Sequence, residues 1–389
     1  MFFNNIFICR LRLCSLRWEY TSRKPLLDTS KILSRLGEAF AKLALLTLRK
    51  ELRDLLDRAK NPAEPVQSIL GILAVLVELG NQQSGQINGL LAELKVIDHL
   101  VAIITSSPVL QVRLLALRAL SSVCCTVESI RGLEQSRGVE IIAGLLTGSL
   151  SLEERVEAAG ALAQVTSPWI TDNHQVEGLT KHVPGMVATL TCLAQLHCGD
   201  DNLLLVTAAL ANLSFMETSS LKCMKQLTTV RKLLERVLIS PFTSVFARDQ
   251  VVTVMANVAA DCDGREDIQQ SNSLEFLASQ MLCKVDEVST LAEQAAVERI
   301  LKKAAIALCR VCQTEDICQD IEALGVIERA MELCKCPSSR NFSDSVLVAC
   351  LALLRRVGSF LPHAVDQSLL QDSLVDSFRE LSIHQESYV

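Results

Sequence analysis

Residues 201–215 read DNLLLVTAALANLSF, an apolar stretch that ends in the apolar pair Leu210 and Leu213, three positions apart. Six other stretches share this ending on an amphipathic pattern: VQSILGILAVLVEL (66–79), LQVRLLALRALSSVC (110–124), LEERVEAAGALAQVT (152–166), FARDQVVTVMANVAA (246–260), VERILKKAAIALCRVC (297–312) and DSVLVACLALLRRVG (344–358). We call the first apolar residue of each closing pair the anchor. The seven anchors recur every 42 to 53 residues, at Leu76, Leu120, Leu162, Leu210, Met255, Leu308 and Leu354.

A second helical pattern lies between successive copies, as in SRGVEIIAGLLT (136–147) and IEALGVIERAMELC (321–334). A short first helix, a second helix and a longer third helix would fill the period, which is in the range of HEAT and armadillo repeats. Such a repeat buries its apolar face only by stacking on its neighbours. The sequence therefore predicts an all-α, armadillo-like solenoid over residues 31–362, a right-handed superhelix of about seven repeats.

The composition excludes several other classes. Hydrophobic residues make up 49% of the 389 residues, aromatic residues only 4%, and there are 16 Gly and 9 Pro. A disordered chain would contain more Pro and charge, and an all-β fold would need more turn and aromatic residues. The net charge of −6 argues against a nucleic-acid partner. The longest uncharged stretch, Val183 to Gly199, is too polar for a membrane helix, so we expect no membrane insertion.

The cysteines and the missing motifs bear on chemistry. The 15 Cys are scattered, which is typical of buried thiols in a reducing compartment, and we expect a cytoplasmic protein. No phosphate-binding loop, dinucleotide fingerprint or hydrolase motif occurs, so we expect no enzyme, no cofactor and no metal site. One alternative stays open, because two cysteine pairs could hold zinc: Cys309 with Cys312, and Cys334 with Cys336.

A polar residue follows each anchor by two positions, where the third helix of an armadillo repeat faces the groove. The first two are Glu78 and Ser122, and the other five, which we call the ladder, are Gln164, Asn212, Asn257, Arg310 and Arg356. An amide offers one acceptor and two donors, so a row of amides can bind the backbone of an extended peptide. The arginines could add contacts to an acidic ligand. The alternative is an ordinary solvated helix face.

Both ends of the chain differ from the repeats. Residues 1–30 hold five basic residues against one acidic residue up to position 27, and we expect a leader outside the folded domain, disordered, although an Arg-rich targeting peptide has a similar composition. Residues 363–389 form an acidic tail. Its last four residues, Glu386, Ser387, Tyr388 and Val389, fit a class I PDZ ligand, whose free carboxylate binds a nest of backbone N–H groups.

Several stretches together resemble the C-terminal part of the Inscuteable family, adaptors of asymmetric cell division. These stretches are AQVTSPW (163–169), ALANLSF (209–215), ARDQVVTVMAN (247–257), SSRNFSDSVLVACLALLRRV (338–357) and the terminal ESYV. The resemblance covers the chain from about Ile32 to its end. It implies an armadillo domain and a tail that binds a PDZ domain of a Bazooka-type polarity scaffold. It also implies recruitment of the Pins/LGN adaptor, and through it of the spindle-orientation machinery, at the apical cortex.

One segment of the family pattern has no counterpart in this sequence. In the family, a helix and an extended peptide upstream of the armadillo domain bind Pins/LGN, and the leader does not match them. Two functions follow as hypotheses. The first is a non-enzymatic adaptor or scaffold that joins the apical polarity complex to the spindle-orientation machinery through its groove and its PDZ-binding tail. The second is an importin- or catenin-like peptide carrier that acts through the ladder.

Overall fold

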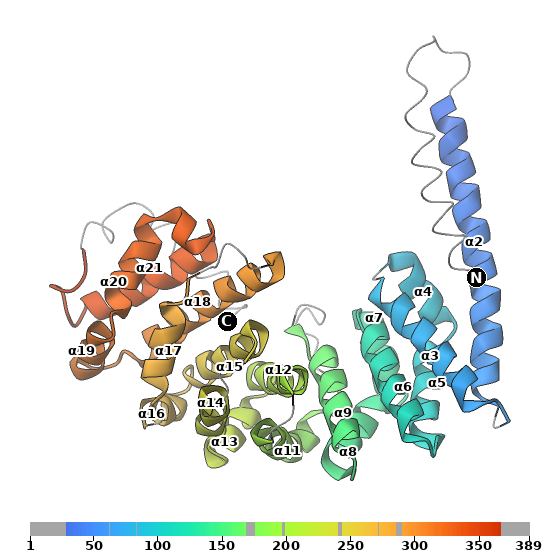
Figure 1. Cartoon of the computed structure of the whole chain (residues 1–389), viewed down its shortest axis with the longest axis horizontal. Coiled ribbons are helices and arrows are strands. Elements are labelled where there is room, and N and C mark those ends of the chain that lie inside the picture. Colours follow the sequence, from blue (N-terminus) through green and yellow to red (C-terminus); the bar gives the residue numbers. More distant parts are fainter. Residues whose placement is uncertain are drawn as a thin grey trace. The chain divides into compact units, whose positions relative to one another are not determined.

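The computed structural model describes residues 29–61, 63–82, 84–168, 176–196, 199–239, 243–270, 272–284 and 290–366. Residues 1–28 of the predicted leader lie outside the described residues. All four residues of the PDZ-ligand motif lie outside them as well. The chain divides into two compact units, residues 1–57 and 58–389. In the first unit the described part is the helix α2 (Thr29–Ala59), which extends two residues past the unit boundary (Figure 1).

The described part of the second unit consists of helices in a recurring order of three, as predicted (Figure 1). The third helices are α3 (Val66–Asn81), α6 (Leu110–Val123), α9 (Leu152–Val165), α12 (Asp200–Met216), α15 (Val245–Val258), α18 (Leu291–Val311) and α21 (Asp344–Gly358). The second helices are α5 (Val96–Ser106), α8 (Gly138–Gly148), α11 (Val183–Gln195), α14 (Thr229–Ile239), α17 (Ser273–Met281) and α20 (Val326–Lys335). The short first helices are α4 (Gly85–Glu93), α7 (Val127–Gln135), α13 (Thr218–Gln226), α16 (Cys262–Gln270) and α19 (Glu315–Ala323). Two 3₁₀ turns, η1 (Thr180–His182) and η2 (Pro337–Arg340), complete the unit.

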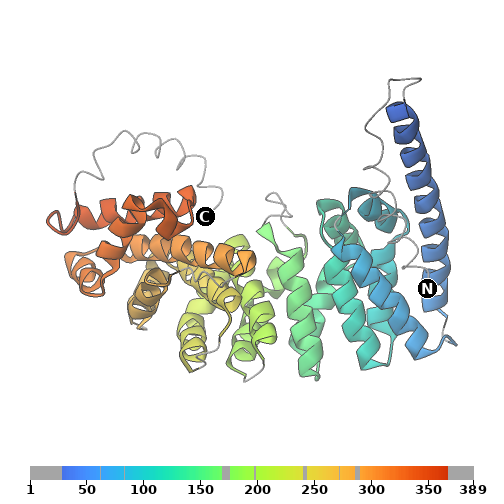
Figure 2. The ribbon, with the colours of Figure 1, turned by 45° about the horizontal axis from the view of Figure 1, so that its top comes forward.

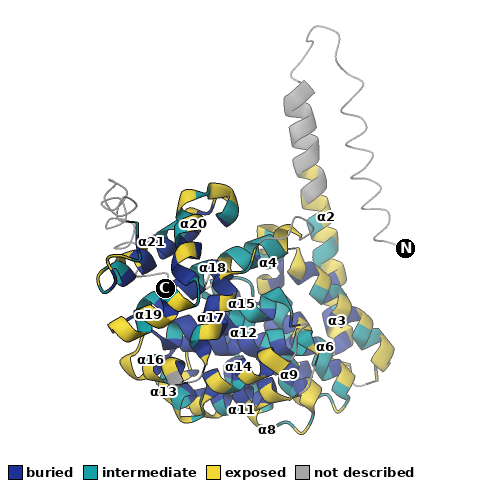
Figure 3. Ribbon diagram, turned by 60° about the vertical axis from the view of Figure 1, so that its left-hand side comes forward, coloured by how far each residue is buried: buried dark blue, intermediate teal, exposed yellow. Residues whose placement is uncertain are grey.

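Each third helix packs on the third helix of the next repeat, from α3 against α6 to α18 against α21. The second helix of a repeat packs on the third helix of the same repeat (Figure 2). All seven anchors lie in this stack and are at most 2% exposed. Buried alanines such as Ala116, Ala159 and Ala209 let neighbouring helices approach closely, which explains a large core with few aromatic residues (Figure 3). The armadillo-like solenoid predicted from the anchor spacing is confirmed.

The turn between the first and second helix requires a left-handed backbone in five repeats. In each of these repeats, the residue directly before the second helix has a positive φ. These residues are Lys95, Arg137, Thr228, Asn272 and Gly325. This conformation costs roughly 1–2 kcal/mol in a residue with a side chain, and glycine avoids the cost. The turn geometry is therefore kept across repeats even where the local sequence does not favour it.

No helix among the described residues is long and apolar enough to cross a bilayer.

One glycine is required by close packing at such a turn. A Cβ on Gly138, the first residue of α8, would lie 2.0 Å from Leu133 Cδ1 and 2.7 Å from Leu133 Cγ. Leu133 is fully buried, so it has no free space into which it can move. Further along the same helix, Gly144 is exposed and has no atom within 4 Å of an added Cβ.

These two glycines give a matched pair of substitutions. We expect Gly138→Ala to lower the free energy of unfolding by about 1–3 kcal/mol, because the new methyl group overpacks the core at Leu133. We expect Gly144→Ala to raise it by about 0.5–1 kcal/mol, since alanine is the better helix former at an open site. Urea unfolding of the full chain, followed by circular dichroism, measures both. Equal effects of the two substitutions would contradict the close contact at Gly138.

Candidate functional site

The five ladder residues occupy equivalent places near the C-terminal ends of α9, α12, α15, α18 and α21. All five side chains are half-buried, unlike the exposed Glu78 of α3. The structure brings successive ladder residues onto successive stacked helices, as the anchor spacing predicts.

The three amides of the ladder each donate a hydrogen bond to the third helix of the preceding repeat. The bonds run from Gln164 Nε2 to Cys124 O (3.2 Å), from Asn212 Nδ2 to Ala163 O (2.7 Å), and from Asn257 Nδ2 to Ala211 O (3.4 Å) and Ser214 Oγ (2.9 Å). Gln164 and Asn212 thus engage one amide N–H each within the protein, whereas the amide nitrogen of Asn257 donates to two acceptors. The amide oxygens of Gln164, Asn212 and Asn257 accept no hydrogen bond from any described residue.

The two arginines of the ladder make the same kind of contact over a longer reach. Arg310 Nη1 donates to Ala256 O at 2.7 Å. Arg356 Nε donates to Cys312 O at 2.7 Å, and its Nη2 donates to Gln313 Oε1 at 2.6 Å. The guanidinium of Arg356 also lies 5.6 Å from the ring centroid of Phe360. Each arginine therefore joins its own repeat to the preceding one.

The acceptors of these bonds explain why a polar residue recurs at the ladder position. Cys124, Ala163, Ala256 and Cys312 lie in the last turn of a third helix or directly after it. Carbonyl groups there have no partner inside their own helix, and a buried carbonyl without a partner is costly. The ladder residue of the next repeat supplies the missing donor. Sequence reasoning missed this bracing role, because the acceptors are backbone atoms of another repeat.

Replacing a ladder residue with alanine tests the bracing role through the stability of the protein, without any ligand. We expect Asn212→Ala to lower the free energy of unfolding by about 1–2 kcal/mol, because Ala163 O loses a hydrogen-bond donor in a half-buried site. Ser122→Ala is the matched control, since the Ser122 hydroxyl bonds only to Arg118 O of its own helix, and we expect a change below about 0.5 kcal/mol. Chemical unfolding of both full-length variants measures the difference. An unaltered stability of the Asn212→Ala protein would contradict the bracing role.

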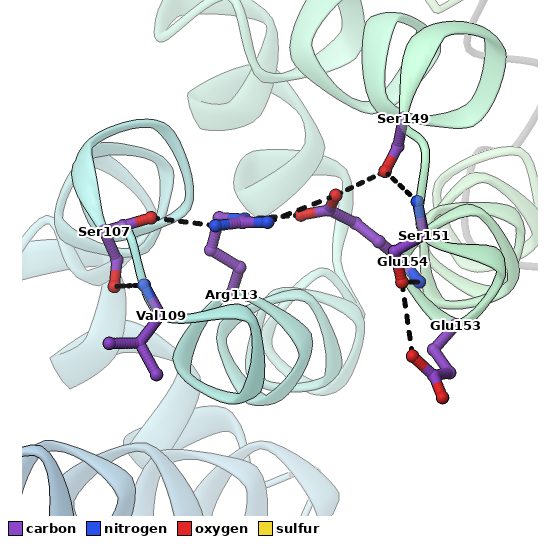
Figure 4. Close-up of polar contacts among 7 residues, drawn as sticks. All are labelled: Ser107, Val109, Arg113, Ser149, Ser151, Glu153 and Glu154. Atoms are coloured by element: carbon purple, nitrogen blue, oxygen red, sulfur yellow. Dashed lines mark hydrogen bonds and ion pairs between the residues drawn. The ribbon is translucent and has the colours of Figure 1, made fainter.

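Charged pairs add a second link between repeats. Arg113 of α6 donates to Glu154 of α9 at 2.6 Å and to Ser107 O at 3.0 Å, while Ser149 Oγ donates to Glu154 Oε2 at 2.5 Å (Figure 4). Burial alone would raise the pKa of Glu154, but the hydrogen bonds from Arg113 and Ser149 outweigh it and hold the pKa below its usual value. Glu154 therefore stays ionised at neutral pH in a buried position.

A second charged cluster joins α15 to α18. Asp249 of α15 is fully buried and receives Arg299 Nε at 2.7 Å and Lys303 Nζ at 3.0 Å, both from α18. Lys303 also donates to Thr253 Oγ1 at 2.5 Å. Burial lowers the pKa of Lys303, and Asp249 opposes that shift. Sequence analysis missed this cluster; the one available signal was a lone aspartate inside the apolar stretch 246–260.

The structure separates the four cysteines of the zinc alternative. Cys309 Sγ donates to Ala352 O at 3.6 Å, and Cys336 Sγ lies 3.1 Å from Ser338 Oγ. The free thiol of Cys312 is hydrogen-bonded to the thiol of Cys318, and that of Cys334 to the thiol of Cys350. Burial raises the pKa of the Cys312 thiol, which disfavours the thiolate that zinc requires. No group of three or more candidate metal ligands occurs among the described residues. The structure thus does not gather these four cysteines into a group of candidate metal ligands.

Cys336 differs from the other thiols in its acidity. Hydrogen bonds from Ser338 and Ser339 lower its pKa to about 7, whereas burial raises the pKa of Cys124 to about 12. We expect alkylation of Cys336 by iodoacetamide to rise with pH and to reach half its maximal rate near pH 7, because the thiolate is the nucleophile. Ser338→Ala should move this midpoint to higher pH. Mass spectrometry of the labelled peptides measures the midpoint, and an ordinary thiol midpoint near pH 8.5 would contradict the assignment.

Comparison with known proteins identifies the family that this chain resembles. Residues 19–389 match the family model described as "Protein inscuteable C-terminal". A mouse protein named "Protein inscuteable homolog" is 38% identical over 284 residues, which cover 70% of this chain and 48% of the mouse protein. The human protein of the same name is 34% identical over 372 residues, covering 92% of this chain and 63% of the human protein. The chain thus spans about half to two thirds of the length of these relatives.

Solved structures bear on the fold alone. Two engineered proteins of known crystal structure superpose with TM-scores of 0.52 at 19% and 21% identity; they cover 88% and 68% of this chain, and the matches span 95% and 97% of the engineered chains. A designed armadillo repeat protein in complex with the peptide (KR)4 matches 65% of this chain and 99% of its own length, with a TM-score of 0.49 and 16% identity.

Proposed function

The chain belongs to the inscuteable C-terminal family, and from this premise we propose that it is a non-enzymatic adaptor of asymmetric cell division. In this proposal it joins an apical polarity complex at the cell cortex to the spindle-orientation machinery. The observation that carries the proposal is the family match, which extends over residues 19–389 and includes both the solenoid and the terminal four residues. A protein-binding adaptor is the function that the family and the solenoid fold support together.

We propose that the first binding element is the terminal motif. Ser387 stands two places before the terminal Val389, the spacing of a class I PDZ ligand. In such a ligand the valine fills an apolar pocket and the free carboxylate binds backbone N–H groups. The partner proposed from the family resemblance is a PDZ domain of a Bazooka-type polarity scaffold. Both the motif and its partner remain predictions, because the motif lies outside the described residues.

We propose that the second binding element is the groove along the ladder. The contacts described above support it in one respect: Gln164 and Asn212 each use one N–H for bracing and keep their oxygen and their second N–H, and Asn257 keeps its oxygen. Because the brace fixes the amide in one orientation, a ligand backbone would meet a pre-organised acceptor and donor, which lowers the entropic cost of binding. Pins/LGN is a further partner proposed from the family, although the segment that binds it there has no match in this sequence.

A binding assay with the full chain tests the adaptor and separates it from the carrier alternative. We expect removal of Val389 to weaken binding to the PDZ domains of a Bazooka-type scaffold at least tenfold, which corresponds to about 1.4 kcal/mol. Val389→Leu is the matched control and should retain most of the affinity, since leucine keeps both an apolar terminal side chain and the carboxylate. Titration calorimetry or fluorescence anisotropy measures the three affinities.

The carrier alternative predicts the opposite pattern in the same assay. Binding would then be insensitive to removal of Val389 and would fall when Asn212 and Asn257 are both replaced by Ala. Because these asparagines also brace the repeats, the double variant must show a folded circular-dichroism spectrum at the assay temperature. Unchanged binding without Val389 would refute the role of the terminal motif.

A further inference from the structure

The third helices differ in charge along the solenoid. The helices α9 and α12 carry five acidic residues and one basic residue, for a net charge of −4. The helices α18 and α21 carry three acidic and six basic residues, for a net charge of +3. We call the six cations the basic end: Arg299, Lys302, Lys303, Arg310, Arg355 and Arg356. The two helices pack directly on each other (Figure 2), so these six cations belong to neighbouring helices of the last two described repeats.

The positions of these cations place several of them on the ladder face. Arg299, Lys303 and Arg310 are four and seven residues apart, spacings that put them on one side of α18. Arg310 and Arg356 are ladder residues themselves. Arg299 and Lys303 both bind the same carboxylate, Asp249, which is fully buried. The ladder face is therefore cationic where the amides give way to arginines.

The positive charge of the basic end is only partly compensated. Lys302 and the exposed Arg355 form no ion pair with any described residue. Burial lowers the pKa of Arg310, with a contribution from the nearby Arg265, and it lowers the pKa of Lys303, with contributions from Arg299 and Lys302. Cations that lower one another's pKa in this way favour a bound anion, because a carboxylate would offset the repulsion between them.

The chain itself carries an acidic segment that begins beside this surface. The described residues end at Asp366, whose carboxylate lies 2.7 Å from Lys335 Nζ on α20, a helix packed against α21. Beyond it, residues 367–389 contain Asp372, Asp376, Glu380 and Glu386 against Arg379. These 23 residues span up to about 75 Å when extended, far enough to pass along α21 and α18. The tether keeps the segment at a high effective concentration near the basic end.

We propose that residues 367–389 of this chain bind the basic end of the groove, with Asp372, Asp376 and Glu380 against the cations of α18 and α21. The bound segment occupies the arginine part of the ladder, so it competes with any acidic ligand for that part of the groove. The bound segment also restrains the terminal four residues. An acidic ligand on the arginine part of the ladder therefore frees the terminal motif, and a partner bound to the terminal motif frees the arginine part of the ladder. Because the contact is mainly electrostatic and solvent-accessible, it weakens as ionic strength rises.

Zero-length cross-linking of the full chain tests this inference without any assumption about PDZ or Pins/LGN binding. A water-soluble carbodiimide joins a carboxylate to a lysine amine only where the two are in contact. At 50 mM salt we expect cross-links from Asp372, Asp376 or Glu380 to Lys302 or Lys303, identified by mass spectrometry. An equal mixture of ¹⁴N- and ¹⁵N-labelled protein distinguishes the source: links within one chain carry a single label, and links between chains carry both.

A charge reversal with a matched control gives the proposal its sharpest test. Arg355→Glu should reduce the yield of these cross-links about fivefold, because a cation is replaced by an anion at the docking surface while both lysines remain. Arg131→Glu is the control: Arg131 is also exposed, is placed on α7, forms no ion pair with a described residue, and should leave the yield unchanged. Raising the salt to 0.5 M should suppress the links in the unsubstituted protein.

Three outcomes would overturn the proposal. Absence of links between the acidic segment and Lys302 or Lys303 at low salt would show that the basic end does not hold this segment. Equal yields in the Arg355→Glu and Arg131→Glu proteins would show that the links arise from unspecific encounters. Links that carry both labels would show that the acidic segment bound to the basic end comes from a second copy of the chain. Thermal unfolding of both variants shows whether they remain folded, and two folded variants with equal yields contradict the proposal.

Discussion

The carbonyl groups at the end of each third helix impose the constraint on which the solenoid depends. They have no partner inside their own helix, and stacking removes them from water. At four of the five junctions from α6 to α21, a ladder residue of the next repeat donates a hydrogen bond to such a carbonyl, over sequence separations of 40 to 54 residues. At these four junctions the end of a third helix therefore gains a hydrogen-bond donor from the repeat that follows it. These hydrogen bonds join neighbouring repeats in addition to the burial of the anchors. In each of them the donor belongs to the later repeat and the acceptor to the earlier one.

The last third helix among the described residues, α21, ends in local backbone hydrogen bonds. After α21 the chain turns back on itself, and Ser359, Phe360 and Leu361 donate their own backbone N–H groups to carbonyls of Arg355, Arg356 and Val357. Leu361 and Val365 are buried beyond this turn. The helix end is thus satisfied locally. Solenoids generally need a distinct terminal element of this kind, since an open repeat face exposes both apolar surface and backbone groups.

Much of the fold could be predicted from the sequence, because its signal is local and periodic. The anchor of each repeat, from Leu76 to Leu354, is a large apolar residue at fixed positions of an amphipathic helix, and each proved to be buried. The partner of a ladder residue could not be predicted in the same way. The donor of Asn212 reaches the backbone oxygen of Ala163, and any residue type presents such an oxygen. Likewise, Thr228 adopts a left-handed turn that its side chain disfavours, so the local sequence carries no sign of it.

The change from amides to arginines along the ladder follows from the same constraint and has a consequence for binding. Both Asn257 and Arg310 supply a donor to the preceding repeat. An amide supplies it without charge, whereas a guanidinium brings a positive charge and keeps further N–H groups for a second acceptor, as Arg356 does with Gln313. The bracing requirement is therefore met equally by either side chain, and the sequence is free to vary the charge of the groove without loosening the stack. A single structural role at the ladder thus permits uncharged side chains in α9, α12 and α15 and cationic ones in α18 and α21.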